Sequence, residues 1–127
     1  FVGYLDRSSD LLDCYRAADL FIFASKTETQ GLVLLEAMAL SVPVVSTAFL
    51  GTRDILGPGK GCLVAEDDEE HFASQVLRLL HDHELRGELR KHARDYALGE
   101  WSASVMAERM ADLYGRLVGR AEISAAA

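Results

Sequence analysis

Three short apolar stretches, each bounded by polar or turn-forming residues, set the order of elements along this chain. Residues 20–25 (LFIFAS), 44–47 (VVST) and 62–64 (CLV) are runs of strand length that are rich in aromatic, aliphatic or β-branched residues. An unbroken apolar run suits a parallel strand that is covered on both faces. We therefore predict three parallel strands, together with a short strand at residues 1–3.

Helical periodicity fills the segments between and after these strands. The helices expected between the strands lie at residues 8–18, 31–40 and 51–56. Beyond the last strand we expect three further helices, which begin at the capping residues Asp67 (paired with Glu70), Asp82 and Ser102. The last of these helices is expected to carry Met106, Met110, Leu113 and Leu117 on one stripe, with Met106 and Met110 packed in the core.

The alternation of strand and helix predicts an α/β fold. It should be a Rossmann-like, partial doubly wound parallel sheet of about three to four strands, with helices on both faces and a helical C-terminal region. We expect the domain to span residues 1–120 and residues 121–127 to form a frayed tail. Because the sequence starts at Phe1 without a methionine, we expect it to be a truncated piece of a longer protein.

Composition narrows the class of protein. The 127 residues are 50% hydrophobic and 26% charged, which is typical of a globular domain. The net charge of −7 argues against a nucleic-acid partner. Cys14 and Cys62 lack a C-x-x-C spacing, so we expect reduced thiols in a cytoplasmic protein. No apolar run approaches the roughly 18 residues of a membrane span, and no signal peptide is visible.

The segment from Thr27 to Thr47 carries the candidate chemistry. A helix that begins at Gly31 leaves its first backbone N–H groups unpaired, which favours binding of a phosphate or another anion. Glu36 lies five residues further on, roughly 7 Å along the axis, where a carboxylate could accept two ribose hydroxyl groups. Glu28, in the preceding loop, could accept the hydroxyls of a sugar at the other end of the same ligand.

This segment resembles the group 1 (family 4) retaining glycosyltransferases, in which two glutamates stand eight residues apart within S-x-x-E-x-x-G-L-x-x-x-E-A-M-A, followed by P-V-V. The matching residues are Ser25, Glu28, Gly31, Leu32, Glu36, Ala37, Met38, Ala39, Pro43, Val44 and Val45. FVGY and YRAADLFIFAS are also similar to the strands that precede this motif in the family. The resemblance covers residues 1 to about 117 and corresponds to the latter part of the C-terminal donor-binding domain of a GT-B enzyme.

The resemblance implies a nucleotide-diphosphate sugar as donor and retaining transfer, with no metal and no cofactor besides this substrate. It implies that Glu36 binds the ribose and that Glu28 acts as the catalytic residue beside the transferred sugar. The backbone amides of Gly31 and Leu32 would bind phosphate. The donor-binding set is Thr29, Gln30, Gly31, Leu32 and Glu36.

The chain departs from the family pattern at three places. The basic pair that neutralises the diphosphate would lie upstream of Phe1, so we expect weak donor binding by these residues alone. Arg53 is the one basic residue of this chain that could reach the phosphates. Ser41 stands where a glycine usually ends the helix, and Leu50 stands in a position where the family often carries glycine.

The acceptor would be a glycan or a lipid, bound by an absent N-terminal domain. The segment ETQGL resembles diacylglycerol glucosyltransferases, which favours a lipid and a location at the cytoplasmic face of a membrane. Arg86, Arg90 and Arg94 could contact anionic lipid or form a solvated face. The apolar strand at 20–25 would have an unpaired edge, which predicts dimerisation or strand exchange of the isolated fragment. Two alternative functions are a non-catalytic nucleotide-binding module and a sugar-nucleotide epimerase of the same fold.

Overall fold

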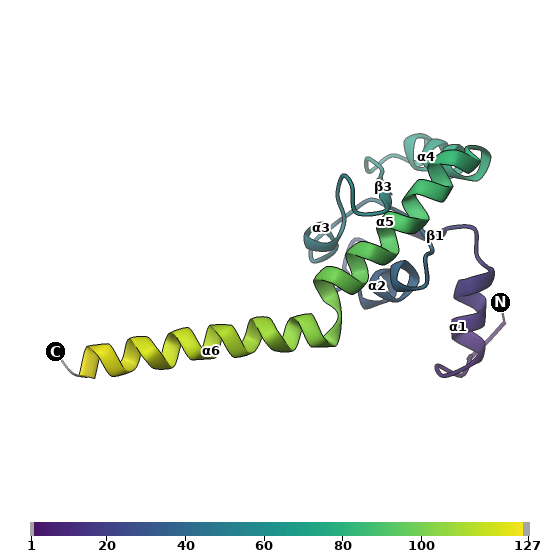
Figure 1. Cartoon of the computed structure of the whole chain (residues 1–127). Helices are drawn as coiled ribbons and strands as arrows, with labels where there is room; N and C mark the ends of the chain where they lie inside the picture. The colour runs from purple at the N-terminus through teal and green to yellow at the C-terminus, as the bar shows by residue number, and fades with distance from the viewer. Residues whose placement is uncertain (1, 126–127) are drawn as a thin grey trace.

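The computed structural model describes the backbone of residues 2–125 and the side chains of residues 2–118, and it places three parallel strands among helices (Figure 1). The elements are α1 Asp10–Ala17, β1 Phe21–Phe23, α2 Leu32–Ala39, β2 Val44–Ser46, α3 Thr52–Ile55, β3 Cys62–Val64, α4 Glu69–His81, α5 His83–Trp101 and α6 Ala103–Ala125. The strand order is β1-β2-β3, and both pairings are parallel. The predicted α/β fold is therefore confirmed.

Helices cover both faces of the sheet. Because side chains alternate between the faces of a strand, Val44 and Val45 of β2 point to opposite sides, and both are fully buried. One face packs against α2 and the middle of α5; its buried residues are Leu34, Met38, Val44, Ala48, Ile55, Leu56, Cys62, Ala93 and Ala97. The other face packs against α4 and the start of α5; its buried residues are Val45, Leu79 and Leu89.

The N-terminal segment differs from the prediction. Residue 1 lies outside the described part of the chain, and residues 2–9 contain no strand. Within residues 2–125, the sheet consists of β1, β2 and β3, and β1 pairs only with β2. Residues 2 and 3 therefore form no ladder with any strand of this sheet. Ser9 precedes α1 but makes no side-chain capping bond, because its hydroxyl donates to the carboxylate of Asp6 at 3.1 Å.

The end of α2 adopts the conformation that the sequence predicted. Ser41 has a φ of 63°, in the left-handed region where glycine is favoured. Its N–H donates to the carbonyl of Met38 at 2.9 Å, and the N–H of Val42 donates to the carbonyl of Ala37 at 2.9 Å. This pair of bonds is a Schellman motif, which satisfies the carbonyls at the helix end and turns the chain into β2.

The predicted N-cap of α4 is wrong, and the predicted N-cap of α5 is confirmed. The N-cap of α4 is Asp68, whose carboxylate accepts from the backbone N–H of His71 at 2.7 Å. The predicted cap, Asp67, instead forms an ion pair with Lys26 at 2.6 Å. Asp82 caps α5 as predicted, because its carboxylate accepts from the N–H of Leu85 at 2.9 Å.

The arginine stripe of α5 contacts the ends of three other helices. Arg86 donates to carbonyls in the last turn of α4, at Leu79 and Leu80. Arg90 donates to Ala18 at the end of α1, and Arg94 donates to Ala39 at the end of α2. Cationic groups are favourable at helix C-termini, where carbonyls lack intrahelical partners. The stripe therefore stabilises the fold. Arg86 and Arg90 are partly buried and Arg94 is exposed, so the solvated face that the sequence favoured is present only at Arg94.

Helix α6 extends away from the body as a rod (Figure 1). Met110, which was predicted to be core, is 49% exposed, so that prediction is wrong. Leu113 and Leu117, on the same stripe, are 45% and 52% exposed. The helix covers residues up to Ala125, within the stretch 121–127 for which a frayed tail is predicted. Residues 126 and 127 lie outside the described part of the chain.

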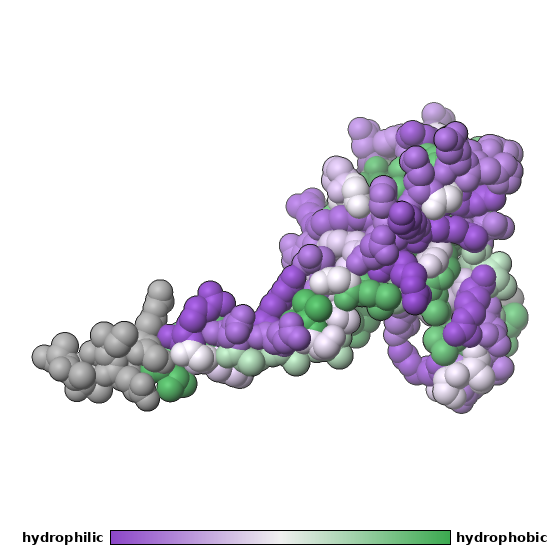
Figure 2. Space-filling view, in the orientation of Figure 1, coloured by the Kyte–Doolittle hydropathy of each residue, from purple (hydrophilic) through white to green (hydrophobic). Residues whose placement is uncertain are grey.

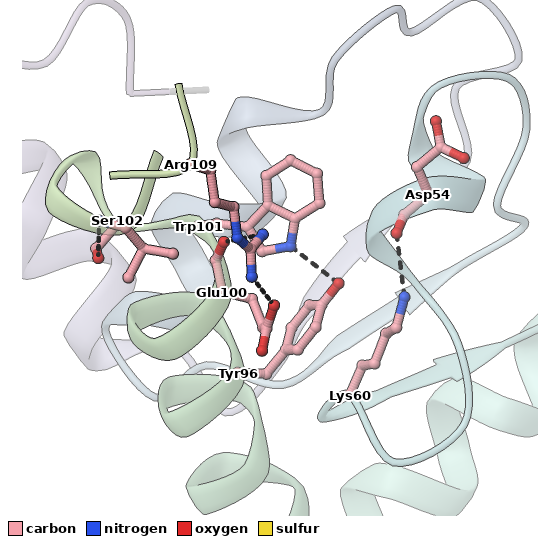
Figure 3. A network of polar contacts seen from close by, with 8 residues as sticks. Asp54, Lys60, Tyr96, Glu100, Trp101, Ser102 and Arg109 are labelled. Carbon is pink, nitrogen blue, oxygen red and sulfur yellow. Dashed lines mark hydrogen bonds and ion pairs between the residues drawn. The ribbon is translucent and has the colours of Figure 1, made fainter. Parts of the chain in front are cut away.

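The junction of α5 and α6 is fixed by polar contacts (Figure 3). The indole N–H of Trp101 donates to the hydroxyl of Tyr96 at 2.9 Å. Arg109 of α6 donates to the carbonyl of Glu100 at 3.1 Å and forms an ion pair with the same residue's carboxylate. Because both partners of that ion pair are half exposed, its contribution to stability should be small.

Candidate glycosyl-donor site

The loop after β1 enters α2 through a left-handed backbone conformation that favours glycine. Gly31, the N-cap of α2, has a φ of 68°. A Cβ at this position would lie 3.2 Å from side-chain carbons of Leu34, Thr52 and Ile55. Both the conformation and the packing therefore favour glycine over larger residues, and side chains of α3 pack against the start of α2.

The carboxylate of Glu28 folds back onto the start of α2. Its Oε1 accepts from the backbone N–H groups of Gln30 and Gly31, each at 3.0 Å. These bonds, chiefly the one from Gly31, lower the pKa of the Glu28 carboxyl below its ordinary value because they stabilise the ionised form. The amide of Gly31, predicted to bind phosphate, is thus engaged by Glu28.

The next two amides of α2 have no such partner. Within residues 2–125, the N–H groups of Leu32 and Val33 form no hydrogen bond. The side chain of Leu32 is 55% exposed, so the first turn of the helix borders the surface. These two amides, next to the acid of the loop, are the available anion-binding groups of this helix end.

Glu36 lies one turn further along α2 and is paired at both oxygens. Its Oε1 accepts from the guanidinium of Arg7, and its Oε2 accepts from the hydroxyl of Tyr15 at 3.2 Å. The carboxylate lies at the edge of a groove of about 270 Å³, and the groove is lined by Leu32, Leu35, Glu36, Ala39, Ala97, Leu98, Trp101 and Ser102. Glu36 is partly exposed, and its charge on this otherwise apolar helix is compensated by Arg7 and Tyr15.

The loop of Glu28 rests directly on a second loop that follows β2. A Cβ added to Gly51 would lie 1.8 Å from the carbonyl oxygen of Thr29, so the two backbones approach as closely as glycine allows. Leu50 and Ala48, in the same loop, have positive φ values of 47° and 53°. Sequence reasoning found the unusual Leu50-Gly51 pair but not its contact, because the contact joins segments separated in the chain.

Arg53, the candidate phosphate contact, lies on the surface of α3. Its Nε donates to the carbonyl of Ala48 at 3.2 Å, which ties it to the loop that supports Glu28. Thr29 and Gln30, the remaining predicted donor-binding residues, are both exposed. The structure thus places all the predicted site residues around the start of α2 and α3, apart from Glu36 one turn along.

A second cleft was not found by sequence reasoning. It has a volume of about 490 Å³, lies at the carboxyl ends of the strands, and is lined by Ala24, Lys26, Thr47, Asp67, Asp68, Glu69, Phe72 and Ala73. It shares no lining residue with the Glu36 groove. The ion pair of Lys26 with Asp67 crosses part of this lining.

Among residues 2–125, no group of three or more His, Cys, Asp or Glu residues is placed to hold a metal ion.

The family model for glycosyl transferases group 1 matches residues 1–96. This chain belongs to the group 1 glycosyltransferases. The resemblance found from Glu28, Glu36 and their surroundings is therefore confirmed. The matched residues include every element up to the last turn but one of α5, and with them both glutamates and the two loops that meet at Gly51.

Individual relatives in this glycosyltransferase family act on varied molecules. A GDP-mannose-dependent monoacylated alpha-(1-6)-phosphatidylinositol monomannoside mannosyltransferase of Corynebacterium glutamicum is 29% identical over 120 residues, which is 89% of this chain and 31% of the relative. A sulfoquinovosyl transferase of Arabidopsis thaliana is 38% identical over 99 residues, covering 75% of this chain and 19% of the relative. The chain therefore spans less than a third of the length of these relatives.

Solved structures show the same fold. Sucrose-phosphate synthase from Thermosynechococcus elongatus aligns with a TM-score of 0.81 at 30% identity, over 94% of this chain and 30% of that one. Anabaena HepE, solved in complex with UDP, aligns with a TM-score of 0.73 at 19% identity, over 81% of this chain and 29% of that one. Among the described residues of this group 1 member, no helix has the length and apolar character needed to cross a bilayer.

Proposed function

We propose that these residues form the donor-binding part of a retaining glycosyltransferase that uses a nucleotide-diphosphate sugar. The observation that carries the proposal is the arrangement around α2. Two acids, Glu28 and Glu36, flank the unpaired amides of Leu32 and Val33. A diphosphate at these amides would place its ribose toward Glu36 and its sugar toward Glu28.

Transfer would proceed through electrostatic stabilisation of the departing nucleoside diphosphate. The N–H groups of Leu32 and Val33 would donate hydrogen bonds to its charged oxygens. Arg53 would add a positive charge if it releases the carbonyl of Ala48. Glu28 would orient the transferred sugar, because its carboxylate is held ionised by the amides of Gln30 and Gly31.

Two acids close to a diphosphate repel it. At 4 Å, each like-charge pair costs about 1 to 4 kcal/mol in a partly solvated site. We therefore propose that the full-length protein supplies further cations and an acceptor-binding N-terminal domain, and that residues 1–127 alone bind donor weakly and do not catalyse transfer. The relatives support a lipid or glycan acceptor, since the Corynebacterium enzyme is named for a phosphatidylinositol mannoside.

We also propose a cytoplasmic location, with contact to the membrane face if the acceptor is a lipid. Cys14 and Cys62 are both unpaired, which supports a reducing compartment. A homodimer through the free edge of β1 is the remaining proposal about partners.

The test uses the full-length protein and isothermal titration calorimetry with UDP, GDP and ADP, followed by transfer assays with the corresponding nucleotide sugars. Glu36→Ala should weaken binding of the preferred nucleoside diphosphate about tenfold or more, since it removes hydrogen bonds to a charged acceptor. Glu28→Ala should leave nucleoside diphosphate binding within about threefold and abolish transfer. Glu88→Ala, on the exposed side of α5, is the matched control.

Unchanged transfer in both the Glu28 and the Glu36 variants would contradict the proposal. Binding of a nucleoside diphosphate without transfer from any nucleotide sugar would favour a non-catalytic nucleotide-binding module.

A further inference from the structure

The two oxygens of Glu36 have different partners, and the difference is informative. Oε2 accepts from the hydroxyl of Tyr15, a residue that is only 7% exposed. Oε1 accepts from Arg7, whose side chain is 70% exposed and belongs to the segment before α1 that has no regular structure. One oxygen is therefore held from inside the protein, and the other faces a group at the surface.

Tyr15 is well placed to act as a fixed donor. Its ring lies 5.7 Å from the ring of Phe21 in β1, measured between centroids, and it packs in a cluster with Ala37 and Val42. Phe21 belongs to the sheet, and Ala37 follows Glu36 in α2. The hydroxyl is thus positioned by the same core that positions the helix of the acid.

We propose that Tyr15 is a positioning residue, which holds Oε2 of Glu36 so that Oε1 is presented to a ribose hydroxyl of the donor. This inference rests on the proposed function. An ionised carboxylate only accepts hydrogen bonds, so a rigid donor at one oxygen fixes the direction in which the other oxygen can accept. Arg7 marks the position at Oε1 where a ligand hydroxyl would donate, and the ligand must displace it.

The protonation state of Tyr15 suits this role. Burial, followed by the negative charge of Glu36, raises its pKa to about 12. The O–H is therefore retained as a donor throughout the neutral range, and Oε2 has a constant partner.

Tyr15→Phe removes the hydroxyl and keeps the ring. In the full-length protein, we expect it to weaken binding of the preferred ligand among UDP, GDP and ADP about five- to tenfold, the scale of one ordinary net hydrogen bond, because Tyr15 acts on the ligand only through Glu36. Affinity for the 2′,3′-dideoxy counterpart of that nucleotide should not change, because this analogue lacks the hydroxyls that reach Oε1. A general disturbance of the fold would weaken both ligands alike.

Two further variants make the test specific. In a Glu36→Ala background, Tyr15→Phe should have no further effect on nucleotide affinity, because the two changes remove the same interaction. Arg7→Ala should leave affinity unchanged or raise it, since it removes a competitor for Oε1. Tyr4→Phe, at a residue that is 92% exposed, is the matched control.

The outcomes separate this inference from the proposed function. If the wild type binds none of the three nucleotides, both fail. If the wild type binds and Glu36→Ala weakens binding, but Tyr15→Phe does not, only the role of Tyr15 is refuted. A loss of affinity in Arg7→Ala equal to that of Glu36→Ala would likewise refute it, because Arg7 would then be the residue that positions the acid. Thermal unfolding of each variant shows whether it is folded under the conditions of the titration.

Discussion

Ser41 and Leu50 adopt left-handed backbone conformations that favour glycine, with φ values of 63° and 47°. Both had already stood out as departures from the family pattern, at positions where relatives in the family often carry glycine. Such a conformation costs a non-glycine residue roughly 1 kcal/mol or more, so stability is lost at both positions.

Replacing Ser41 by glycine should raise the free energy of unfolding by about 1 kcal/mol, because the Schellman motif at the end of α2 would no longer carry a strained Cβ. Urea denaturation monitored by circular dichroism measures the change. Ser41→Ala is the control, since it removes the hydroxyl and keeps the Cβ, and it should show no comparable gain. A Ser41→Gly variant that is no more stable than the Ser41→Ala variant would contradict the interpretation.

Among the glycines of the site, Gly51 is expected to be the most sensitive to substitution. In Gly51→Ala, the new Cβ would lie 1.8 Å from the carbonyl oxygen of Thr29, so the loop that carries Glu28 must move. Displacement of a substrate-contacting group by about 1 Å can cost about a hundredfold in rate, and we expect a loss of transfer activity on that scale. Gly57→Ala, whose new Cβ would lie 3.7 Å from Lys60, should retain activity.

Glu28 should make stability depend on pH at the acidic end. Its pKa is lowered from the ordinary 4.5 by the amides of Gly31 and Gln30, so the ionised form stabilises the folded state. This stabilisation is present above the ordinary pKa and is lost as the pH falls below it. Between about pH 5 and pH 3, the wild type should lose stability relative to Glu28→Gln, whose side chain stays neutral. If the free energies of unfolding of the two proteins change in parallel across this pH range, the hydrogen bonds from the amides to Glu28 are not formed.

Among the elements, α5 has the widest structural role, because its arginines bind the ends of α4, α1 and α2. Arg90 is partly buried, and its Nη2 donates to the carbonyl oxygen of Ala18 at 2.9 Å. Arg90→Met should therefore lower the free energy of unfolding by about 1.5 to 3 kcal/mol through loss of a charged hydrogen bond to Ala18. Lys91→Met, at the exposed neighbouring position, should change stability by less than about 0.5 kcal/mol. Equal effects in urea denaturation would contradict this role of Arg90.

The sequence predicted elements better than it predicted contacts between them. The apolar runs gave β1, β2 and β3 to within a few residues, because a buried parallel strand has a direct compositional signal. The arginine stripe, interleaved with acids, looks like a solvated helix face. Its partners are carbonyls 72 and 55 residues away for Arg90 and Arg94, and periodicity along one helix carries no information about them.

The same distinction holds for the site. Glu28, Gly31 and Glu36 could be predicted because they lie in one continuous segment with a family pattern. Tyr15 could not be predicted as the partner of Glu36, since it is 21 residues away and belongs to another helix. Engagement of the Gly31 amide by Glu28 is a local contact, but it depends on how the loop folds over Gly51 and not on spacing.

At the scale of the whole molecule, two apolar surfaces have no cover within residues 2–118. One is at β1, the edge strand, where Ile22 is 57% exposed and α4 packs mainly against the neighbouring strand β2. The other is one side of α6, whose exposed residues are Met110, Leu113, Tyr114, Leu117 and Val118. Figure 2 shows this second surface as paler and green residues along the lower edge of the projecting helix.

The free edge of β1 is the surface that should cause self-association of the 127-residue chain. Its backbone groups on that side lack a ladder partner among the described residues, and hydrogen bonding to a second copy would satisfy them. Light scattering over a range of concentrations should show a dimer that Ile22→Lys weakens about tenfold or more, because a charge at an edge opposes pairing. Leu117→Lys, on α6, should leave the dimer intact. If Leu117→Lys dissociates it and Ile22→Lys does not, the copies meet through the helix and the strand edge is not the interface.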